Sequence, residues 1–537
     1  MKKSIWTCFE IELHSSANYA NPFQDVDVTA VFTGPDGREI KRLAFWDGGD
    51  TWKVRAALTC TGGWKYEVSA SDGNADFAIE GEIECVPYEG DKDIYKHGFL
   101  RVGPQGRYLI YDDGTPFFWL GDTHWTFVTE ERWAESNYPK YESQFKACVD
   151  KRVEQKYTVY QSNFRDGKDY HLFGRYDEYL IDSENGLIPD VKFMQSNVDL
   201  KMQYIADAGL VHATGWTWGS AICREGMVER YKLLVKYLIA RYGAYPVVWT
   251  LAGEVPGYFP GMKQEMTDKW REIALETVKW DSYGTLQSVH QAAGLPFTEV
   301  YMGEEWYDFA MTQGAHGDFE IWGGNYSAYK AKFPRMPIIE SEGLYEGADS
   351  NEPMSRVITD KMMRNLAYNA IQNGCCGYTY GVNGVWELQW EAGVGGIGWG
   401  DMAWWDGLEL PGAQQLTYMR EMYESVGWHR LRPIQHLIDQ AGFGGKVAKF
   451  SEAFFTGDDE MTTVVGYFQP ASMKFCTIHG LSRKSYTARW FDPETGEYTP
   501  ITSDARPVKG TWAVPRPENM FRRVKKDQVL IVTANEE

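Results

Sequence analysis

Two glutamates at the ends of apolar segments offer the chemistry that the sequence indicates most directly. Glu254 ends the segment PVVWTLAGE (246–254), and Glu342 ends the segment MPIIESE (336–342). Two carboxylates on opposite walls of one pocket suit glycosidic cleavage, because one protonates the departing oxygen while the other attacks the anomeric carbon. A separation of about 5 to 5.5 Å gives retention of configuration, and about 6.5 to 9.5 Å gives inversion. The pair therefore predicts cleavage of a glycosidic bond.

Each of these glutamates has a competing interpretation. Glu254 could be a strand-end residue held in a salt bridge, without a catalytic role. Glu340, Glu342 and Glu346 lie in one segment, so the attacking carboxylate must be chosen among them. Side-chain alternation along a strand puts Glu340 and Glu342 on the same side, with Glu342 nearer the strand end. We therefore prefer Glu342 to Glu340.

Further polar and aromatic residues gather where other apolar segments end, and these are the candidate substrate-binding residues. They are Asp122, His124, Trp125, Trp216, Trp218, His290, Gln313, His316 and Trp386. Indole rings can stack on sugars, whereas His and Gln side chains can bind hydroxyl groups or orient a carboxylate. Packing offers the alternative: His124 and Trp125 could fill a barrel rim, and the other candidates could be ordinary buried residues.

The elements that would position these residues alternate between short strands and longer helices. Eight candidate strands fall at 116–123, 157–164, 210–218, 246–254, 284–290, 309–316, 336–342 and 374–381. Amphipathic helices are predicted between several of them, for example MVERYKLLVKYLIARYG, because apolar residues recur there at steps of three and four. This pattern predicts an α/β fold, a (β/α)8 TIM barrel with its active site at the carboxyl ends of the strands.

Both ends of the chain have a different pattern from the middle. Segments such as VDVTAVF and WKYEVSA alternate apolar and polar residues between turns, and strand-like segments such as TTVVGYF return after about residue 430. The chain is predicted to contain an N-terminal antiparallel β-sandwich (1–92), a catalytic barrel (93–430) and a C-terminal β-sandwich (431–537).

At this level of detail the sequence resembles the apiosidase-like glycoside hydrolases of clan A. The resemblance is carried by FWLGDTHW (118–125), VWTLAGE (248–254), WYDF (306–309) with Gln313 and His316, and MPIIESEGLYEG (336–347). It implies a retaining enzyme with Glu254 as general acid/base and Glu342 as nucleophile. It also implies the two flanking sandwiches. Family members often have Asp where this chain has Glu254, and the residues before the nucleophile differ from Glu340-Ser341, which leaves the apiose specificity open.

The composition of the chain indicates which classes of partner and ligand it is suited to bind. The chain has 54 Lys and Arg against 75 Asp and Glu, a net charge of −21, which disfavours nucleic acid and anionic membranes as partners. Aromatic residues make up 15% of the chain, in keeping with a carbohydrate or plant glycoside substrate or with a large aromatic core. His124, His290 and His316 lack the spacing of a metal site, and nucleotide-binding motifs are absent. We expect no cofactor and no catalytic metal, and leave a structural ion open.

Scattered cysteines and the first residues bear on location. The eight cysteines form no CxxC pair, so we expect reduced thiols. A signal peptide needs an apolar run of about 7 to 15 residues near the first residues, but Trp6, Glu10 and Glu12 occur before such a run could form. We therefore expect a cytoplasmic protein. The expected activity is exo-acting hydrolysis of a small glycoside or oligosaccharide, such as a pentoside. A transglycosylase with the same carboxylates, a non-catalytic carbohydrate-binding protein and assembly into a homo-oligomer stay open.

Overall fold

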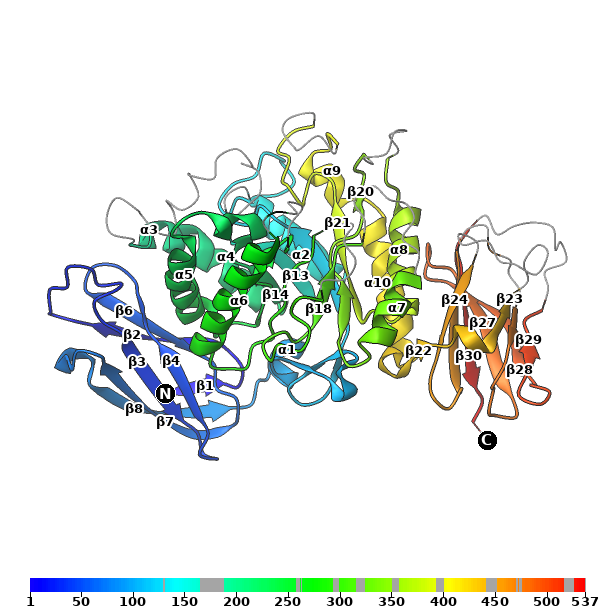
Figure 1. Cartoon of the computed structure of the whole chain (residues 1–537), viewed down its shortest axis with the longest axis horizontal. Helices are drawn as coiled ribbons and strands as arrows, with labels where there is room; N and C mark the ends of the chain where they lie inside the picture. The colour runs from blue at the N-terminus through cyan, green and yellow to red at the C-terminus, as the bar shows by residue number, and fades with distance from the viewer. Residues whose placement is uncertain are drawn as a thin grey trace.

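The computed structural model has one parallel sheet at the centre of the chain and antiparallel sheets towards both ends (Figure 1). The structure describes residues 1–128, 131–164, 188–256, 261, 263–292, 299–314, 324–349, 357–392, 400–440, 452–469, 472, 476–515 and 526–536. The candidate site belongs to the central sheet, so the arrangement of that sheet comes first.

The central sheet is parallel at every pairing along its path, with the order β16-β14-β13-β12-β21-β19-β18. The strands are β12 (Trp119–His124), β13 (Val159–Asn163), β14 (Val211–Gly215), β16 (Val247–Trp249), β18 (Ala310–Thr312), β19 (Ile338–Glu340) and β21 (Gly377–Val382). Short strands β15 (Thr217–Trp218) and β17 (Ala252–Gly253) pair with each other, and β20 (Tyr345–Glu346) pairs with β21. The carboxyl ends of all these strands consequently point the same way.

The segment predicted as a strand at 284–290 contains isolated bridges instead of a strand. Parallel bridges join Trp249 to Gln287 and His290 to Met311. The backbone N–H of Gln287 donates to the Asp308 carboxylate at 2.8 Å. In a regular strand this N–H would donate to a backbone carbonyl group of the neighbouring strand. The segment nevertheless runs between β16 and β18.

Helices such as α4, α5, α6, α8 and α10 lie around this sheet (Figure 1). The helices of the described residues are α1 (Asp93–His97), α2 (Gln144–Glu154), α3 (Val191–Phe193), α4 (Asp199–Asp207), α5 (Met227–Tyr242), α6 (Lys263–Trp280), α7 (Gly324–Lys332), α8 (Asp360–Gln372), α9 (Trp404–Leu408) and α10 (Gly412–Ser425). In α5, Leu234, Val235 and Leu238 are buried at steps of one and three, which gives the helix the apolar stripe expected from the sequence.

Two sheets form the N-terminal part. One has the order β1-β8-β7-β3-β4 and the other the order β2-β6-β5. Their strands are β1 (Lys2–Ser4), β2 (Phe9–His14), β3 (Val28–Thr33), β4 (Glu39–Leu43), β5 (Phe45–Trp46), β6 (Thr51–Ala56), β7 (Gly62–Ala70) and β8 (Ile79–Val86). Burial alternates strictly along β2, as the period of two predicts. A small sheet of β9 (Leu100–Val102), β10 (Leu109–Tyr111) and β11 (Pro116–Phe117) follows.

Two further sheets form the C-terminal part, in the orders β22-β24-β25-β30-β27-β28 and β23-β26-β29. The strands are β22 (Arg432–Pro433), β23 (Ile438–Gln440), β24 (Ala453–Gly457), β25 (Thr463–Phe468), β26 (Cys476–Ile478), β27 (Tyr486–Phe491), β28 (Tyr498–Ala505), β29 (Trp512–Ala513) and β30 (Gln528–Ala534). A hairpin turn at 492–496 joins β27 to β28. The Gly496 backbone N–H donates to the Asp492 carbonyl, and Gly496 has a φ of 76°. A positive φ is the reason that glycine suits this position.

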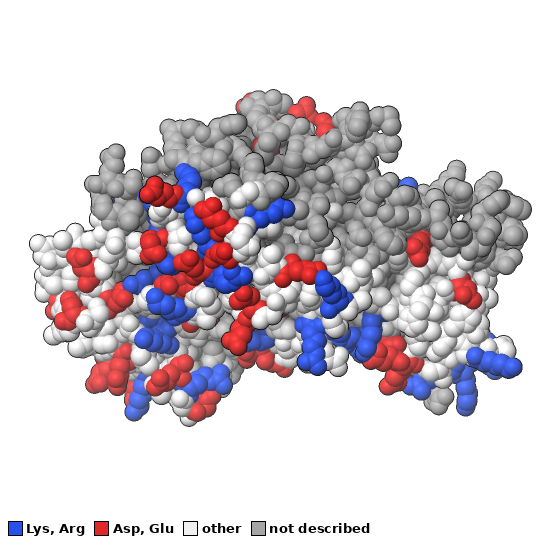
Figure 2. Space-filling view, viewed as in Figure 1, with Lys and Arg blue, Asp and Glu red and all other residues white. Residues whose placement is uncertain are grey.

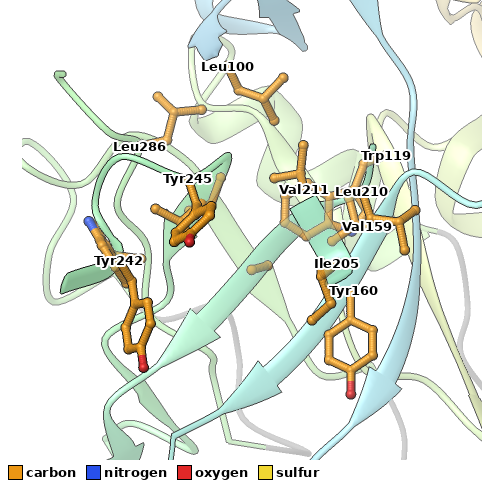
Figure 3. Packing of buried hydrophobic residues seen from close by; sticks show 14 of the residues in the cluster. Leu100, Trp119, Val159, Tyr160, Ile205, Leu210, Val211, Tyr242, Tyr245 and Leu286 are labelled. Carbon is orange, nitrogen blue, oxygen red and sulfur yellow. The ribbon is translucent and has the colours of Figure 1, made fainter. Parts of the chain in front are cut away.

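Buried apolar side chains connect the central sheet to its helices. Figure 3 shows Val159 and Val211 from adjacent strands, together with Ile205 of α4, in this core. The same core continues into both the N-terminal sheets and the first C-terminal sheet. The sheet that carries the candidate site is therefore supported from several sides.

Charged side chains of both signs intermingle over the face formed by α5 and α6 (Figure 2). Several of them form ion pairs, such as Lys232–Glu229 and Lys269–Glu265. The net negative charge of the chain is therefore not concentrated on that face.

Within the described parts of the chain, no helix is long and apolar enough to cross a membrane.

Candidate active site

Glu342 lies buried just after β19 and has two polar neighbours. Its side chain is 4% exposed. The Tyr345 hydroxyl donates to Oε1 at 2.7 Å, and Nε2 of His290 lies 2.9 Å from Oε2. The Tyr345 hydrogen bond therefore orients the Glu342 carboxyl group at the carboxyl end of the sheet.

Glu254 directly follows β17 and has an unusual backbone conformation. Its φ is 60°, a region that non-glycine residues seldom adopt, and its side chain is partly exposed. The preceding Gly253 packs against an aromatic ring, since a Cβ there would lie 2.6 Å from the Trp218 indole. The positive φ turns the chain at this point and directs the residue away from the regular strand path.

Tyr345 connects the two candidate carboxylates. Burial raises the pKa of its phenol well above the usual value, and the negative charges of Glu342 and Glu254 raise it further. The charge of Glu254 therefore reaches the same phenol to which Glu342 is hydrogen-bonded. The structure thus brings the two predicted carboxylates into one region.

Aromatic rings surround this region. The Trp125 indole N–H donates to the Tyr345 hydroxyl at 2.9 Å, and the Trp125 ring meets those of Trp218 and His290 edge-on, at centroid distances of 5.4 and 5.2 Å. Trp386 stacks on Tyr345 at 4.9 Å, and its carbonyl accepts from the Trp125 backbone N–H. Four residues chosen from the sequence, Trp125, Trp218, His290 and Trp386, therefore lie together around the carboxylates.

Gln313 follows β18 and lies beside the nucleophile candidate. The backbone N–H of Gly314 donates to the Glu342 carbonyl at 3.1 Å, so the two segments are adjacent. The Gln313 side chain is 2% exposed, and neither of its polar atoms has a hydrogen-bond partner among the described residues. A buried amide of this kind is costly unless a ligand or water satisfies it. His316 lies outside the described residues.

Asp122 and His124 belong to a buried charged network below the aromatic rings. His124 Nε2 lies 3.0 Å from the Asp122 carboxylate, and Nδ1 lies 2.8 Å from Glu131. Arg152 pairs with Asp122 at 2.6 Å. Burial lowers the pKa of His124, but the Glu131 and Asp122 carboxylates outweigh it and raise the pKa to about 9. These contacts are those of supporting residues, and direct substrate binding by this pair stays a prediction.

Trp216 and Trp218 have different surroundings. Trp216 is fully buried and stacks on Trp249 at 4.6 Å and on Phe164 at 6.1 Å. Phe164 in turn stacks on Tyr242 of α5, so this aromatic group packs between the sheet and a helix. Trp216 therefore has the contacts of a core residue, whereas Trp218 touches Trp125 in the candidate site. A sugar contact by Trp216 stays a prediction.

Glu340, the competitor of Glu342, is completely buried and fully engaged. It accepts hydrogen bonds from the Thr312 hydroxyl at 2.7 Å, the Gly314 N–H at 2.8 Å and the Tyr326 hydroxyl at 2.5 Å. Burial raises the pKa of its carboxyl to about 7. Its contacts tie the end of β18 to β19, which is a structural role and favours Glu342 as the reacting carboxylate.

Two site residues were missed at the level of sequence. Tyr345 follows Glu342 by three residues, and a hydroxyl at that spacing after a carboxylate was the available signal. Asn163 ends β13 and is 1% exposed, with Nδ2 unpartnered within the described residues. Its amide lies against both Gly215 and Gly253, at the ends of neighbouring strands. The rule that polar residues gather at the ends of neighbouring strands would have included Asn163.

The described residues contain no group of three His, Cys, Asp or Glu that could hold a metal ion.

Comparison with known families gives two matches in separate parts of the chain. Residues 103–430 match the family described as "Apiosidase-like, catalytic domain". Residues 2–71 match a "Domain of unknown function (DUF5060)". A search of curated proteins finds no match. The larger match contains every residue of the candidate site.

Solved structures of similar fold cover most of the chain. A putative glycoside hydrolase from Bacteroides vulgatus ATCC 8482 superposes with a TM-score of 0.72 at 18% identity, covering 99% of each chain. A structure titled "Glycoside hydrolase" gives 0.66 at 22% identity, covering 82% of this chain and 98% of that one. A family 5 glycoside hydrolase from the same Bacteroides strain gives 0.64 at 22%, covering 82% and 94%. The overall arrangement of sheets is therefore shared with these proteins.

Proposed function

The chain belongs to the apiosidase-like family and is a glycosidase, and we propose that it works by retaining double displacement with Glu254 as general acid/base and Glu342 as nucleophile. The observation that carries this proposal is the position of Tyr345, which is hydrogen-bonded to Glu342 and within electrostatic reach of Glu254. Two carboxylates on either side of one reaction centre are what the mechanism needs.

We propose further that the central strands close into a (β/α)8 barrel. The sheet runs from β16 through β12 and β21 to β18, and parallel bridges link residues 287 and 290 to its two ends. In a closed barrel of this kind Glu254 and Glu342 face each other across the mouth. This arrangement supports a shared substrate between them.

The reaction has two steps. The Glu342 carboxylate attacks the anomeric carbon while the Glu254 carboxyl gives its proton to the departing glycosidic oxygen, which leaves as an alcohol. Water then attacks the glycosyl ester, Glu254 takes a proton from that water, and Glu342 departs as a carboxylate. Tyr345 and His290 hold Glu342 in the orientation for attack. The product keeps the anomeric configuration of the substrate.

The proposed substrate is a small glycoside or oligosaccharide cleaved from its end, with pentosides such as apiosides as the first candidates. Burial of Glu342 among Trp125, His290 and Trp386 suits a terminal sugar better than the middle of a long chain. The unpartnered Gln313 amide suits a hydrogen bond with a sugar hydroxyl.

All eight cysteines are unpaired, which supports the proposed cytoplasmic location.

The test is hydrolysis of nitrophenyl glycosides, including apiofuranosides, other pentosides and hexosides, by wild type and by Glu254→Ala and Glu342→Ala. We expect Glu342→Ala to lose at least about a thousandfold in kcat/KM on every substrate, because the first step needs the nucleophile. Glu254→Ala should lose mainly in kcat, because a nitrophenyl group leaves without a proton whereas the attack of water on the glycosyl ester still needs the base. Azide should restore turnover of Glu254→Ala with a glycosyl azide of retained configuration, because it attacks the ester on Glu342. Azide with Glu342→Ala should give the opposite anomer.

Glu340→Gln is the matched control, because it changes a carboxyl two residues from the proposed nucleophile. We expect this variant to hydrolyse the substrate without added azide and to give a product of retained configuration. The role of Glu342 is refuted when Glu342→Ala turns over at the wild-type rate and Glu340→Gln does not. Proton NMR of the first-formed product from wild type decides retention directly, and an inverted product would reject double displacement.

A further inference from the structure

A cavity of about 210 Å³ lies at the end of the central sheet opposite the catalytic carboxylates. Cys375 and Cys376, which directly precede β21, form part of its wall, whereas Trp386 of the candidate active site follows the other end of that strand. The C-terminal sheets close the cavity through Arg432 of β22 and Thr456 of β24. The cavity is thus separate from the active site and lies where the central and C-terminal parts meet.

The charged residues around this cavity are all basic. Arg107, Lys330 and Arg432 line it, and its described lining contains neither Asp nor Glu. Such a local excess contrasts with the net charge of −21 for the whole chain. Lys330 donates to the Met336 carbonyl, and Arg432 pairs with the exposed Asp459. Within the described residues, Nε of Arg107 is buried without a hydrogen-bond partner.

The basic groups around this cavity lie close enough to affect one another. Burial lowers the pKa of Arg107, and the neighbouring Arg432 lowers it further, against smaller opposite effects of Tyr108 and Asp459. Burial also lowers the pKa of Lys330 and of His429, and Arg107 contributes in the same direction to both. Like charges that depress one another in this way attract an anion.

The remaining walls are apolar and aromatic. The Tyr108 ring meets Trp428 edge-on at 5.7 Å and lies 5.6 Å from the His429 ring. Ile371 and Leu431 complete the apolar surface. The combination of a few polar groups with apolar walls is typical of sites for small molecules.

We propose that this cavity is a second ligand site that binds a small organic anion, with its oxyanion head on Arg107 and its body against Tyr108 and Trp428. The head is a carboxylate or a phosphate, since both accept hydrogen bonds from a guanidinium group. Binding there joins the C-terminal sheets to the central part, because Arg107 precedes β10 and Arg432 lies in β22. The proposal is independent of the catalytic assignment.

The test is calorimetric titration and thermal unfolding of the full chain with inorganic phosphate, phenyl phosphate and benzoate, with benzyl alcohol as the uncharged probe. We expect saturable binding of at least one anion, which raises the melting temperature, and no comparable binding of benzyl alcohol. Phenyl phosphate and benzoate are titrated separately, so a comparison of their affinities shows which head group the cavity prefers.

Arg107→Met should weaken anion binding about tenfold or more, since it removes a charge-assisted hydrogen bond. Without anion, this variant should be as stable as wild type or more stable, because it removes a buried Nε that has no hydrogen-bond partner among the described residues; a residue that is only structural would destabilise the protein. Arg506→Met, at an exposed arginine of the C-terminal part, is the matched control. Absence of saturable anion binding to wild type, equal binding of benzyl alcohol, or unchanged binding to Arg107→Met would each overturn the proposal.

Discussion

At the scale of single residues, Tyr345 is the hydrogen-bond partner of the proposed nucleophile, Glu342. Its hydroxyl accepts from Trp125 and donates to Glu342, so one phenol links an aromatic wall to the proposed nucleophile. Tyr345→Phe should lower kcat/KM by about ten- to a hundredfold, since a hydrogen bond to a charged group contributes about 1.5 to 3 kcal/mol. Steady-state kinetics on the best glycoside measures this loss.

Tyr301→Phe is the matched control for that substitution. Tyr301 is equally buried, and its hydroxyl donates to the Thr267 carbonyl at 3.0 Å, away from the site. We expect this variant to lose some stability and keep wild-type kcat/KM. An equal loss of activity in both variants would show that Tyr345 acts through general stability and not through Glu342.

The buried His124 makes stability depend on pH. Its pKa is raised to about 9 in the folded chain by Glu131 and Asp122, against an ordinary value of 6.5. The folded state therefore holds its proton more tightly, so this stabilisation is complete below about pH 6.5 and is lost as the pH rises through 9. The resulting change in the free energy of unfolding is at most about 3.5 kcal/mol.

Urea unfolding of wild type and His124→Gln at intervals from pH 6 to pH 9.5 measures this effect. The free energy of unfolding should fall with pH in wild type and fall less steeply in the variant. Parallel pH profiles for the two proteins would mean that His124 is neutral in the folded state, contrary to the charged network described here.

At the scale of elements, β21 packs through a glycine against Tyr345, the hydrogen-bond partner of the proposed nucleophile. Gly381 of β21 pairs with Tyr345 of β20, and a Cβ there would lie 2.1 Å from the Tyr345 ring. Gly381→Ala should displace the ring, lower kcat/KM at least about tenfold and cost about 1 to 3 kcal/mol of stability. Kinetics and urea unfolding measure the two effects.

Gly63→Ala serves as the control for Gly381→Ala, because Gly63 also lies in a strand but a Cβ there meets no atom within 4 Å. It should leave kcat/KM and stability close to wild type. Retained activity in Gly381→Ala would mean that the ring can shift without moving Glu342.

Strand positions could largely be predicted from the sequence, because most of the apolar runs end in polar or aromatic residues that mark the carboxyl edge of the sheet. Glu254, His290 and Glu342 were selected as candidates by this rule. The segment at 284–290 shows where it fails, since the Asp308 carboxylate replaces a backbone partner and no local pattern reveals such a contact. Burial is equally hidden: Trp216 and Trp218 differ by two positions, yet one fills the core and the other reaches the site.

At the scale of the whole molecule, buried charges lie at both junctions between the central part and the terminal sheets. Arg42 of β4 donates to the carbonyl groups of Ile239 and Ala240 in α5. At the other junction, Arg364 of α8 binds Asp527 through Nε and Nη2, both at 2.9 Å. Figure 1 shows the two terminal parts on opposite sides of the central sheet.

Breaking one of these pairs should destabilise the entire chain. Asp527→Ala leaves the Arg364 guanidinium buried without one of its carboxylates, and we expect a loss of about 3 kcal/mol. Asp504→Ala removes the partner of the exposed Arg506 and should change stability by less than about 0.5 kcal/mol. Urea unfolding measures both, and similar losses in the two variants would show that the buried pair is no stronger than an exposed one.

The pair between Arg364 and Asp527 has a consequence for the ancestry of the protein. A recombination event that delivered a new C-terminal region without an acid at position 527 would leave an arginine buried in a foreign interface. The C-terminal region is therefore expected to keep an acid at position 527 wherever the central part keeps an arginine at position 364. Lineages of this architecture should diversify by paired substitution across the junctions more readily than by exchange of whole segments.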